Sequence, residues 1–135
     1  MDLELKEELI VLLKNITDIQ YENFQKTDVH DKVLHLNTQK NVAKVFTYTE
    51  QKILESEVRL HFDSFIKKLK IFCPNLTVKE LLICCLSLRF PLKTISMCFG
   101  YSNINSIKQH KCRIKKKMTS DVNNAFLFDF IFKNR

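Results

Sequence analysis

Apolar residues recur at helical spacing in the first part of the chain. They follow one another in steps of three or four residues, at Leu5, Leu9, Leu12, Ile16 and Ile19, and the stripe is widened by Ile10, Val11 and Leu13. This spacing predicts a helix over about 2–24 with one broad apolar face. We expect that face to be buried, either among other helices of a bundle or against a second copy of the chain.

The next segment, 25–41, is more polar, and shorter elements are expected in it. A cap at Thr27 or Asp28 predicts a short helix that carries Val29, Val33 and Leu36. A longer helix is expected over about 38–61, with one apolar side formed by Val42, Phe46, Ile53 and Leu60.

A further short helix is expected before the first proline. Asp63 or Ser64 can cap this helix, and its apolar face consists of Phe65, Leu69 and Phe72. Pro74 ends it, because the residue before a proline is disfavoured in the helical conformation. Residues 1–72 contain no evident ligand site and are predicted to form a helical segment for dimerisation or for coupling to another protein.

After that proline, the chain carries a strong signal for the start of a helix. Thr77 and Glu80 have the T-x-x-E spacing of a capping box, which predicts an apolar helix over about 78–89. Pro91 then suits the start of a short helix over about 92–98, since its missing N–H costs little there.

Gly100 is the only glycine in the sequence, and it directly follows that short helix. Glycine adopts a positive φ without strain, so it commonly ends helices. Ser102 or Asn103 can cap the next helix, which is expected over about 104–118. Two helices joined by a tight glycine turn are typical of a helix-turn-helix, and residues 73–135 are predicted to form such a domain.

The composition favours helices and excludes several classes of protein. One glycine and two prolines in 135 residues are too few for a turn-dense β-sandwich, a β-barrel or a collagen-like repeat. A single glycine also cannot build the phosphate-binding loop of a Rossmann or P-loop fold. The predicted fold class is therefore all-α: a helical N-terminal segment, either a bundle or a coiled coil, followed by the C-terminal helix-turn-helix domain.

The net charge of +7 arises entirely in the second part of the chain. Residues 1–75 carry a net charge of −1, and residues 76–135 carry +8. Six cations fall within the ten residues 108–117. Such a cluster produces a positive potential that suits a polyanion, although a lysine run on a solvated helix face is the plainer explanation.

The helix over about 104–118 divides into two faces. At 100° per residue, one side groups Ile107, His110, Ile114 and Met118, and this side is expected to pack inward. The opposite side is polar and cationic. Glutamine can bind adenine through two hydrogen bonds, and lysine or arginine can bind guanine or phosphate.

The stretch 76–118 resembles the LuxR/GerE-type helix-turn-helix of bacterial transcription regulators. The resemblance rests on the opening LTVKE, the step Lys93–Ser96 and the ending SIKQHKCRIKKKM. Phe90 and Pro91 stand where that family has a Gly-x-Ser stretch. The sequence FCPNLTVKELLICCL also resembles Bacteroidetes regulators in which a helical segment precedes this domain.

The resemblance implies that the outward face of the third helix reads the major groove of DNA. Together with the helix geometry, it gives the base-contact candidates Asn105, Lys108, Gln109 and Cys112. Candidates for phosphate contacts are Lys93, Ser102, Asn103, Lys111, Arg113, Lys115 and Lys116.

The aromatic tail allows two interpretations. A cap at Ser120 or Asp121 predicts a final helix on which Val122, Phe126 and Phe130 pair with Leu127 and Ile131. Alternation of Phe126, Phe128, Phe130 and Phe132 would instead suit a strand. We expect a helix, which the resemblance also implies, packed within the chain or across a dimer.

The five cysteines are an odd number without C-x-x-C spacing, so neither a disulfide framework nor a zinc site is expected. A reducing cytoplasm is the expected location. The acidic start of the chain does not resemble a secretory signal, and the apolar runs are too short to cross a membrane. No metal, cofactor or membrane partner is expected.

No nucleophile, base and orienting group share one motif, so an enzyme is not expected; Cys112, beside several cations, is the one candidate for an activated thiolate. The favoured hypothesis is a transcription regulator that binds double-stranded DNA as a homodimer. An upstream protein is a further candidate partner, through the N-terminal helices. The alternative is a helical protein-interaction module, an adaptor or anti-regulator that has the same fold but does not bind DNA.

Overall fold

A computed structural model describes residues 2–38 and 44–133 of the chain. Over these residues all regular structure is helical, which confirms the all-α prediction. The elements are α1 (Leu3–Phe24), α2 (Asp28–Asn37), α3 (Tyr48–His61), α4 (Asp63–Phe72), α5 (Val78–Ser87), α6 (Leu92–Cys98), α7 (Asn105–Thr119), the 3-10 helix η1 (Val122–Asn124) and α8 (Ala125–Phe132). None of the helices in this part of the chain is long and apolar enough to span a membrane.

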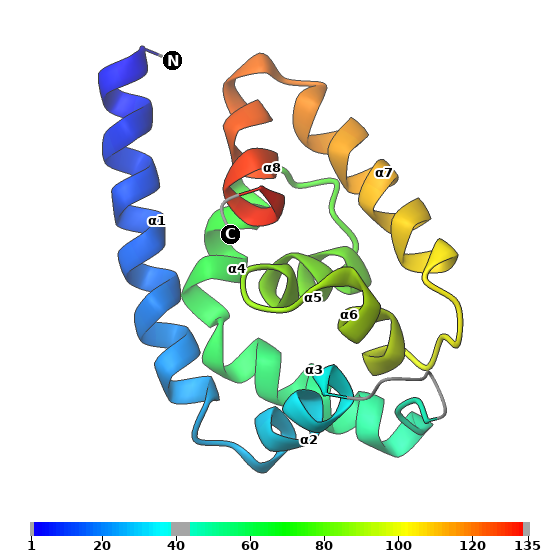
Figure 1. Cartoon of the computed structure of the whole chain (residues 1–135). Coiled ribbons are helices and arrows are strands. Elements are labelled where there is room, and N and C mark those ends of the chain that lie inside the picture. Colours follow the sequence, from blue (N-terminus) through cyan, green and yellow to red (C-terminus); the bar gives the residue numbers. More distant parts are fainter. Residues whose placement is uncertain (1, 39–43, 134–135) are drawn as a thin grey trace.

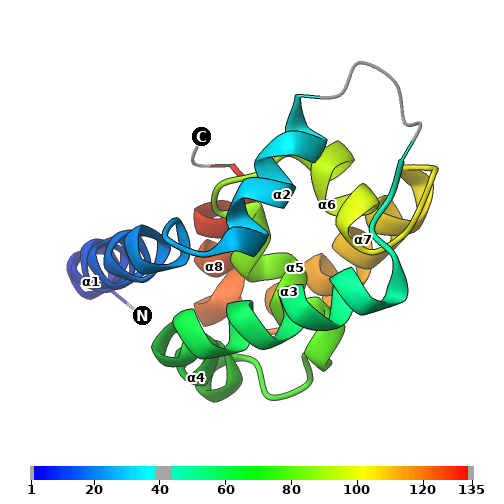
Figure 2. The same ribbon diagram turned by 90° about the horizontal axis from the view of Figure 1, so that it is seen from below.

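Helix α5 occupies the middle of the molecule, and α3, α4, α6 and α8 contact it (Figures 1 and 2). Every residue from 80 to 87 is buried, so the helix has no solvent-facing side over this stretch. Its start is fixed by the capping box that the sequence predicted, with Thr77 and Glu80 each accepting the other's backbone amide. The helix ends at Ser87, two residues before the predicted end.

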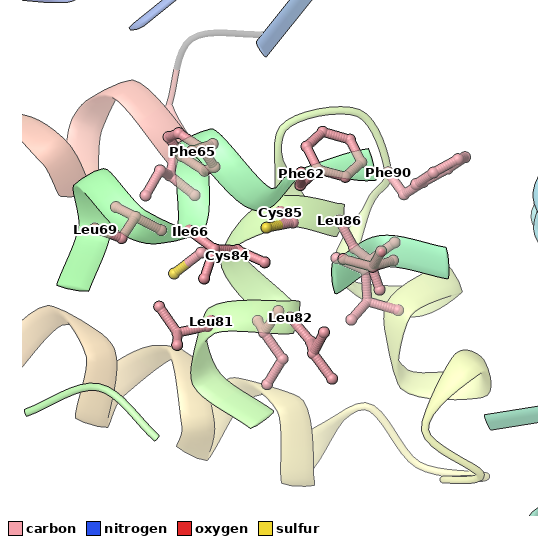
Figure 3. Close-up of a cluster of buried hydrophobic side chains, with 14 of the residues drawn as sticks. Phe62, Phe65, Ile66, Leu69, Leu81, Leu82, Cys84, Cys85, Leu86 and Phe90 are labelled. Carbon is pink, nitrogen blue, oxygen red and sulfur yellow. The ribbon is translucent and has the colours of Figure 1, made fainter. Parts of the chain in front are cut away.

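The segments before and after residue 72 share one hydrophobic core. Figure 3 shows Phe62, Phe65 and Leu69, from the N-terminal half, around the thiols of Cys84 and Cys85 on α5. Helix α2 also contacts α6, and α3 and α4 both contact α5. The N-terminal helices therefore form part of the support on which the later helices rest.

Helix α3 begins at Tyr48, ten residues later than the predicted start at residue 38. Thr47 and Glu50 form a second capping box, which fixes this start. Residues 44–47 are not helical, and the amide of Phe46 donates to the carbonyl of Met97 at 3.0 Å. Val42, expected on the apolar side of this helix, lies outside the described residues.

Helix α4 follows α3 with only Phe62 between them, and the predicted caps at its start are wrong. Neither Asp63 nor Ser64 caps the helix, since both lie inside its first turn. The Asp63 carboxylate instead pairs with Lys67 at 2.9 Å. The amide of Phe62 donates to Val58 in α3, and its carbonyl accepts from Ile66 in α4, so hydrogen bonding continues through the junction.

Helix α1 buries one edge of the broad apolar face that was expected, with Leu13 fully buried and Leu9 and Ile10 packed against the core. Its buried residues are Leu13, Thr17 and Phe24, on the side that contacts α3 and α4. The middle of the predicted stripe is rotated by roughly 100° from this side, and three of its residues are exposed: 53% of Leu5, 47% of Leu12 and 62% of Ile19 face solvent.

The aromatic tail is helical, as predicted, and packs within the chain. Its buried residues in α8 are Phe126, Leu127, Phe128, Phe130 and Ile131. Val122 was expected among them but is exposed in η1, because Asp121 caps that short 3-10 helix by accepting the amide of Asn123 at 2.9 Å. Only the last two turns of the tail therefore contribute to the core.

Candidate nucleic-acid interface

The turn between α6 and α7 is built around Gly100. Its φ is +79°, a conformation that side chains with a Cβ strain to adopt. The Tyr101 amide donates to the Ser96 carbonyl at 3.0 Å, and the Gly100 amide donates to the Met97 carbonyl at 3.1 Å. These two bonds are those of a Schellman motif, which ends α6 and turns the chain toward α7.

Two polar side chains fix the rest of this turn. The buried hydroxyl of Ser96 donates to the carbonyl of Asn103 at 3.0 Å. The side chain of Asn103 accepts the backbone amide of Asn105 at 2.8 Å, so it satisfies one of the free amides at the start of α7. The predicted caps are nevertheless wrong, because the N-cap residue of α7 is Ile104, which makes no side-chain cap, and Ser102 and Asn103 both precede it.

The N-terminal segment braces the same turn. The side-chain amide of Gln51, in the first turn of α3, donates to the carbonyl of Phe46 at 3.0 Å. A Cβ at position 100 would lie 2.5 Å from this Gln51 nitrogen and 3.4 Å from the Phe46 carbonyl oxygen. The close fit of Gly100 against these groups holds the turn to the start of α3.

The inner face of α7 is anchored where the sequence placed it. Ile107, Ile114 and Met118 are fully buried. His110 is half-buried, and its ring stacks on that of Tyr101 with 6.5 Å between centroids. Burial lowers the pKa of His110, and the neighbouring charges of Lys79 and Arg113 lower it further, so this ring packs as a neutral group.

The outer face of α7 holds the four candidates for base contacts. Asn105, Lys108, Gln109 and Cys112 are all exposed. They lie on one side of a helix whose opposite side is fixed in the core, so their backbone positions are rigid. Lys108, the charged residue among them, makes no ion pair with the described residues, so all four side chains are accessible to a ligand.

The candidates for phosphate contacts fall into two groups at opposite ends of α7. Lys93, Ser102 and Asn103 line one hollow of about 330 Å³ at the start of the helix. Arg113, Lys115 and Lys116 are exposed on its later turns.

Lys111, the remaining candidate, is in a different environment. It is half-buried beside α8, with its ammonium group 5.9 Å from the ring centroid of Phe128 and 5.3 Å from that of Phe132. Lys115 approaches Phe128 in the same way, at 5.6 Å. These cation–π contacts hold both lysines on the α8 side of the helix.

Sequence reasoning missed two lysines that shape this surface. Lys117 donates to the buried carboxylate of Glu80 at 2.6 Å and to the carbonyl of Asn75 at 3.0 Å, so it fastens α7 to the start of α5. Lys79 is exposed beside the turn and donates to the Tyr101 hydroxyl at 2.9 Å. Its place two residues after the cap Thr77 was the one available signal, because that position faces away from the core.

The charge of α7 is almost unopposed. The helix contains six cations and no Asp or Glu. Among the described residues, only Lys117 of these six forms an ion pair, with Glu80. The other five leave a positive field over the exposed face, where a polyanion would be attracted.

The cysteines divide by burial. Cys73, Cys84, Cys85 and Cys98 are buried, and Cys112 is exposed on α7. Burial raises the pKa of Cys84 and Cys85, and it raises the pKa of Cys98 to about 12, so these thiols stay protonated. Within the described residues, no group of three or more His, Cys, Asp or Glu side chains could hold a metal ion.

The exposed face of α7 offers amide and cationic donors in a row along a rigid helix. Such a face can bind an extended polyanion, and its amide side chains can add hydrogen bonds at defined positions. No family model, curated protein or solved structure matches the chain. Function therefore has to be inferred from the residues of α6 and α7 themselves.

Proposed function

We propose that the chain is a sequence-specific DNA-binding transcription regulator, with α6 and α7 as a helix-turn-helix of the LuxR/GerE type. One observation carries the proposal. The face of α7 opposite its buried side combines Gln109 and Asn105 with cations and lacks any carboxylate. DNA recognition needs this combination, because cations supply affinity and amide side chains supply specificity.

The recognition helix in this proposal is α7, inserted in the major groove. An α-helix with side chains is about 10–12 Å wide, and the major groove is about 12 Å wide. Gln109 is suited to paired hydrogen bonds with adenine, and Lys108 to guanine. Asn105 and Cys112, each about one turn away on the same face, would contact neighbouring base pairs.

Phosphate contacts would come from both ends of α7. Lys93, Ser102 and Asn103 would bind one strand near the start of the helix, and Arg113, Lys115 and Lys116 the other strand near its end. Lys79 is an added candidate beside the first group, from its exposure and its contact with Tyr101. Contacts at both ends would fix how far along the groove the helix lies.

The N-terminal helices would couple this domain to a signal. In the proposed division, residues 1–72 form the coupling segment and residues 73–135 the DNA-binding domain. The contact between Gln51 and the Gly100 turn supports the coupling, because a movement of α3 would reach the turn directly. An upstream protein bound to the N-terminal helices could therefore change the orientation of α7.

The test is selection of bound fragments from random duplex DNA, followed by affinity measurements over a range of salt concentrations. We expect the selected fragments to share a motif, and the affinity to fall steeply as salt rises. The double variant Arg113→Ala, Lys116→Ala should lower the slope of log affinity against log salt by about 2, because it removes two phosphate contacts. Its matched control is Lys32→Ala, Lys70→Ala, which removes the same charge from exposed sites on α2 and α4.

Two outcomes would overturn the proposal. The first is no salt-dependent binding to duplex DNA, which would leave the helical protein-interaction module as the better explanation. The second is an equal loss of affinity in both double variants, which would show that net charge matters and that α7 does not.

A further inference from the structure

Three lysines gather on one aromatic ring where α8 packs against α7 (Figure 1). The ammonium groups of Lys111 and Lys115, on α7, lie 5.9 and 5.6 Å from the ring centroid of Phe128. That of Lys133, the residue that follows α8, also lies 5.9 Å from this centroid. We call these three lysines and Phe128 the α8 lysine cluster. Lys133 was not among the candidates for phosphate contacts, because the sequence places it after the aromatic tail and outside the basic helix.

The aromatic side chains under these lysines are fixed in the core. Only 4% of Phe128 is exposed, and its ring centroid lies 4.8 Å from that of Phe132, which Lys111 also approaches at 5.3 Å. A ring of this kind attracts a cation through its quadrupole and offers an apolar surface to the stem of the lysine. Both effects restrict the lysine side chains, so the three ammonium groups are already gathered before a ligand binds.

The cluster carries more positive charge than the two helices balance. Asp129, which pairs with Lys133 at 3.0 Å, is the only carboxylate on α7 or α8. Lys111 and Lys115 form no ion pair within the part of the chain that the structure describes. They are four residues apart on one helix, where two like charges repel. An anion placed among the three lysines would remove this repulsion.

We propose that the α8 lysine cluster binds phosphates of the DNA backbone, which makes α8 part of the interface; the inference rests on the proposed function of α7. Lys111 and Lys115 directly precede Cys112 and Lys116, which lie on the exposed side of α7, and each is about 100° around the helix from the residue that follows it. A helix inserted in the major groove lies between two phosphate backbones. The backbone on the α8 side of the helix would therefore pass over the cluster.

The exposure of the cluster favours a long polyanion over a free phosphate ion, although both offer the same phosphate oxygens. Lys115 and Lys133 are exposed, and the lysines extend from two neighbouring helices. Each contact between exposed charges is weak in water, so a small ion would gain little from the cluster. A DNA backbone makes many such contacts at once and releases counterions at each of them, and its affinity arises from their sum.

The first experiment measures the affinity of the full chain for duplex DNA over a range of salt concentrations. Lys133→Ala should weaken binding to all sequences alike and lower the slope of log affinity against log salt by about 1. The matched control is Lys67→Ala on α4. Lys67 pairs with Asp63, four residues before it, at 2.9 Å, just as Lys133 pairs with Asp129 at 3.0 Å. Each variant therefore removes one exposed lysine and one such pair.

The outcomes separate this inference from the proposed function. Equal slopes for Lys133→Ala and Lys67→Ala, beside a lower slope for Lys116→Ala, would overturn the role of α8 and leave the proposed function standing. Slopes equal to that of the wild type in all three variants would overturn both, because the DNA would then lie on another surface. A wild-type chain without salt-dependent binding to duplex DNA would also overturn both.

The second experiment distinguishes the DNA backbone from a free phosphate compound. The ring signals of Phe128 and Phe132 are followed by NMR spectroscopy while duplex DNA or inorganic pyrophosphate is added at constant ionic strength. We expect DNA to shift these signals in the wild type and to shift them less in Lys133→Ala. Signals that shift with pyrophosphate and not with DNA would assign the cluster to a small phosphorylated ligand and overturn the proposal. Signals that shift with neither would overturn it as well.

Discussion

The ammonium group of Lys117 lies 2.6 Å from the Oε1 atom of Glu80, and this contact fastens the end of α7 to the start of α5. The same oxygen accepts the backbone amide of Thr77 at 2.8 Å. Burial by itself raises the pKa of Glu80, but the hydrogen bonds from Lys117 and Thr77 outweigh it and leave the pKa below its ordinary value. One charged carboxylate therefore serves as helix cap and as anchor for α7.

Glu80→Gln should lower the free energy of unfolding by about 1–3 kcal/mol, because hydrogen bonds to a buried charge are replaced by weaker ones. Urea denaturation measures the loss. The control is Glu55→Gln, which removes two ion pairs on the surface of α3, at 3.4 and 3.8 Å, and should cost less than about 1 kcal/mol. Equal losses would mean that the contact with Lys117 adds nothing to the stability.

Gly100→Ala should destabilise the chain by about 1–3 kcal/mol, since a non-glycine residue is strained at a φ of +79°. The added Cβ also meets the amide of Gln51. The double variant with Gln51→Ala separates the two effects: strain persists in it, and the collision does not. Thermal unfolding of Gly100→Ala, of Gln51→Ala and of the double variant measures both, and a fully stable Gly100→Ala chain would contradict the role given to this turn.

Stability should fall as the pH drops below about 6.5, the ordinary pKa of histidine. His30 is buried against Tyr21, whose hydroxyl lies 2.9 Å from Nε2 and whose ring is covered by the Arg89 guanidinium. Burial lowers the pKa of His30, and Asp31 at 3.9 Å raises it only in part. At a pH below about 6.5, His30 is therefore protonated more readily in the unfolded chain than in the folded chain, so acid favours unfolding.

The measurement is the free energy of unfolding at pH 7.5 and at pH 5.5, for the wild type and for His30→Asn. The variant should lose less stability between the two pH values, whatever its stability at pH 7.5. His110 also has a lowered pKa, so some pH dependence should remain. An unchanged difference in the variant would assign the effect to other groups.

Local signals in the sequence predicted the elements that position α7. The capping box at Thr77 and Glu80, the glycine turn at Gly100 and the inward side of α7 depend on residues within a few positions of one another. Near neighbours determine caps and turns, so a sequence window contains the needed information. The start of α3 also has a local signal, because Thr47 and Glu50 have the same capping-box spacing. The prediction followed the apolar periodicity instead, and it therefore placed the start of this helix ten residues too early.

Other features depend on contacts between distant residues and could not be predicted. Helix α1 has apolar residues on two sides, and only the positions of α3 and α4 decide that Leu13 is buried and Leu12 exposed. Lys117 and Glu80 are 37 positions apart in the sequence. Nothing in the sequence distinguishes Lys117 from Lys115 and Lys116 as the lysine that forms an ion pair. The buried side of α1 and the ion pair of Lys117 are therefore determined by the packing of the whole chain.

Gln109→Ala and Lys116→Ala should change DNA binding in different ways. Removing Gln109 should relax the preference at one base pair by about 1–3 kcal/mol and leave the salt dependence unchanged. Removing Lys116 should weaken binding to all sequences alike and lower the salt slope by about 1. Affinities for the selected site and for single-base variants of it distinguish the two, with Lys70→Ala as a charge control. If neither variant affects binding, the assignment of α7 as the recognition helix is wrong.

Cys112 gives a direct measure of whether DNA covers α7. In the native chain, an alkylating reagent should modify this thiol and spare the other four, which are buried. Saturating duplex that contains the selected site should slow the reaction of Cys112 severalfold, because the thiol shares a helix face with Gln109. The Lys116→Ala variant at the same DNA concentration should lose part of this protection. Equal alkylation with and without DNA, at concentrations where binding is complete, would place the bound DNA on another surface.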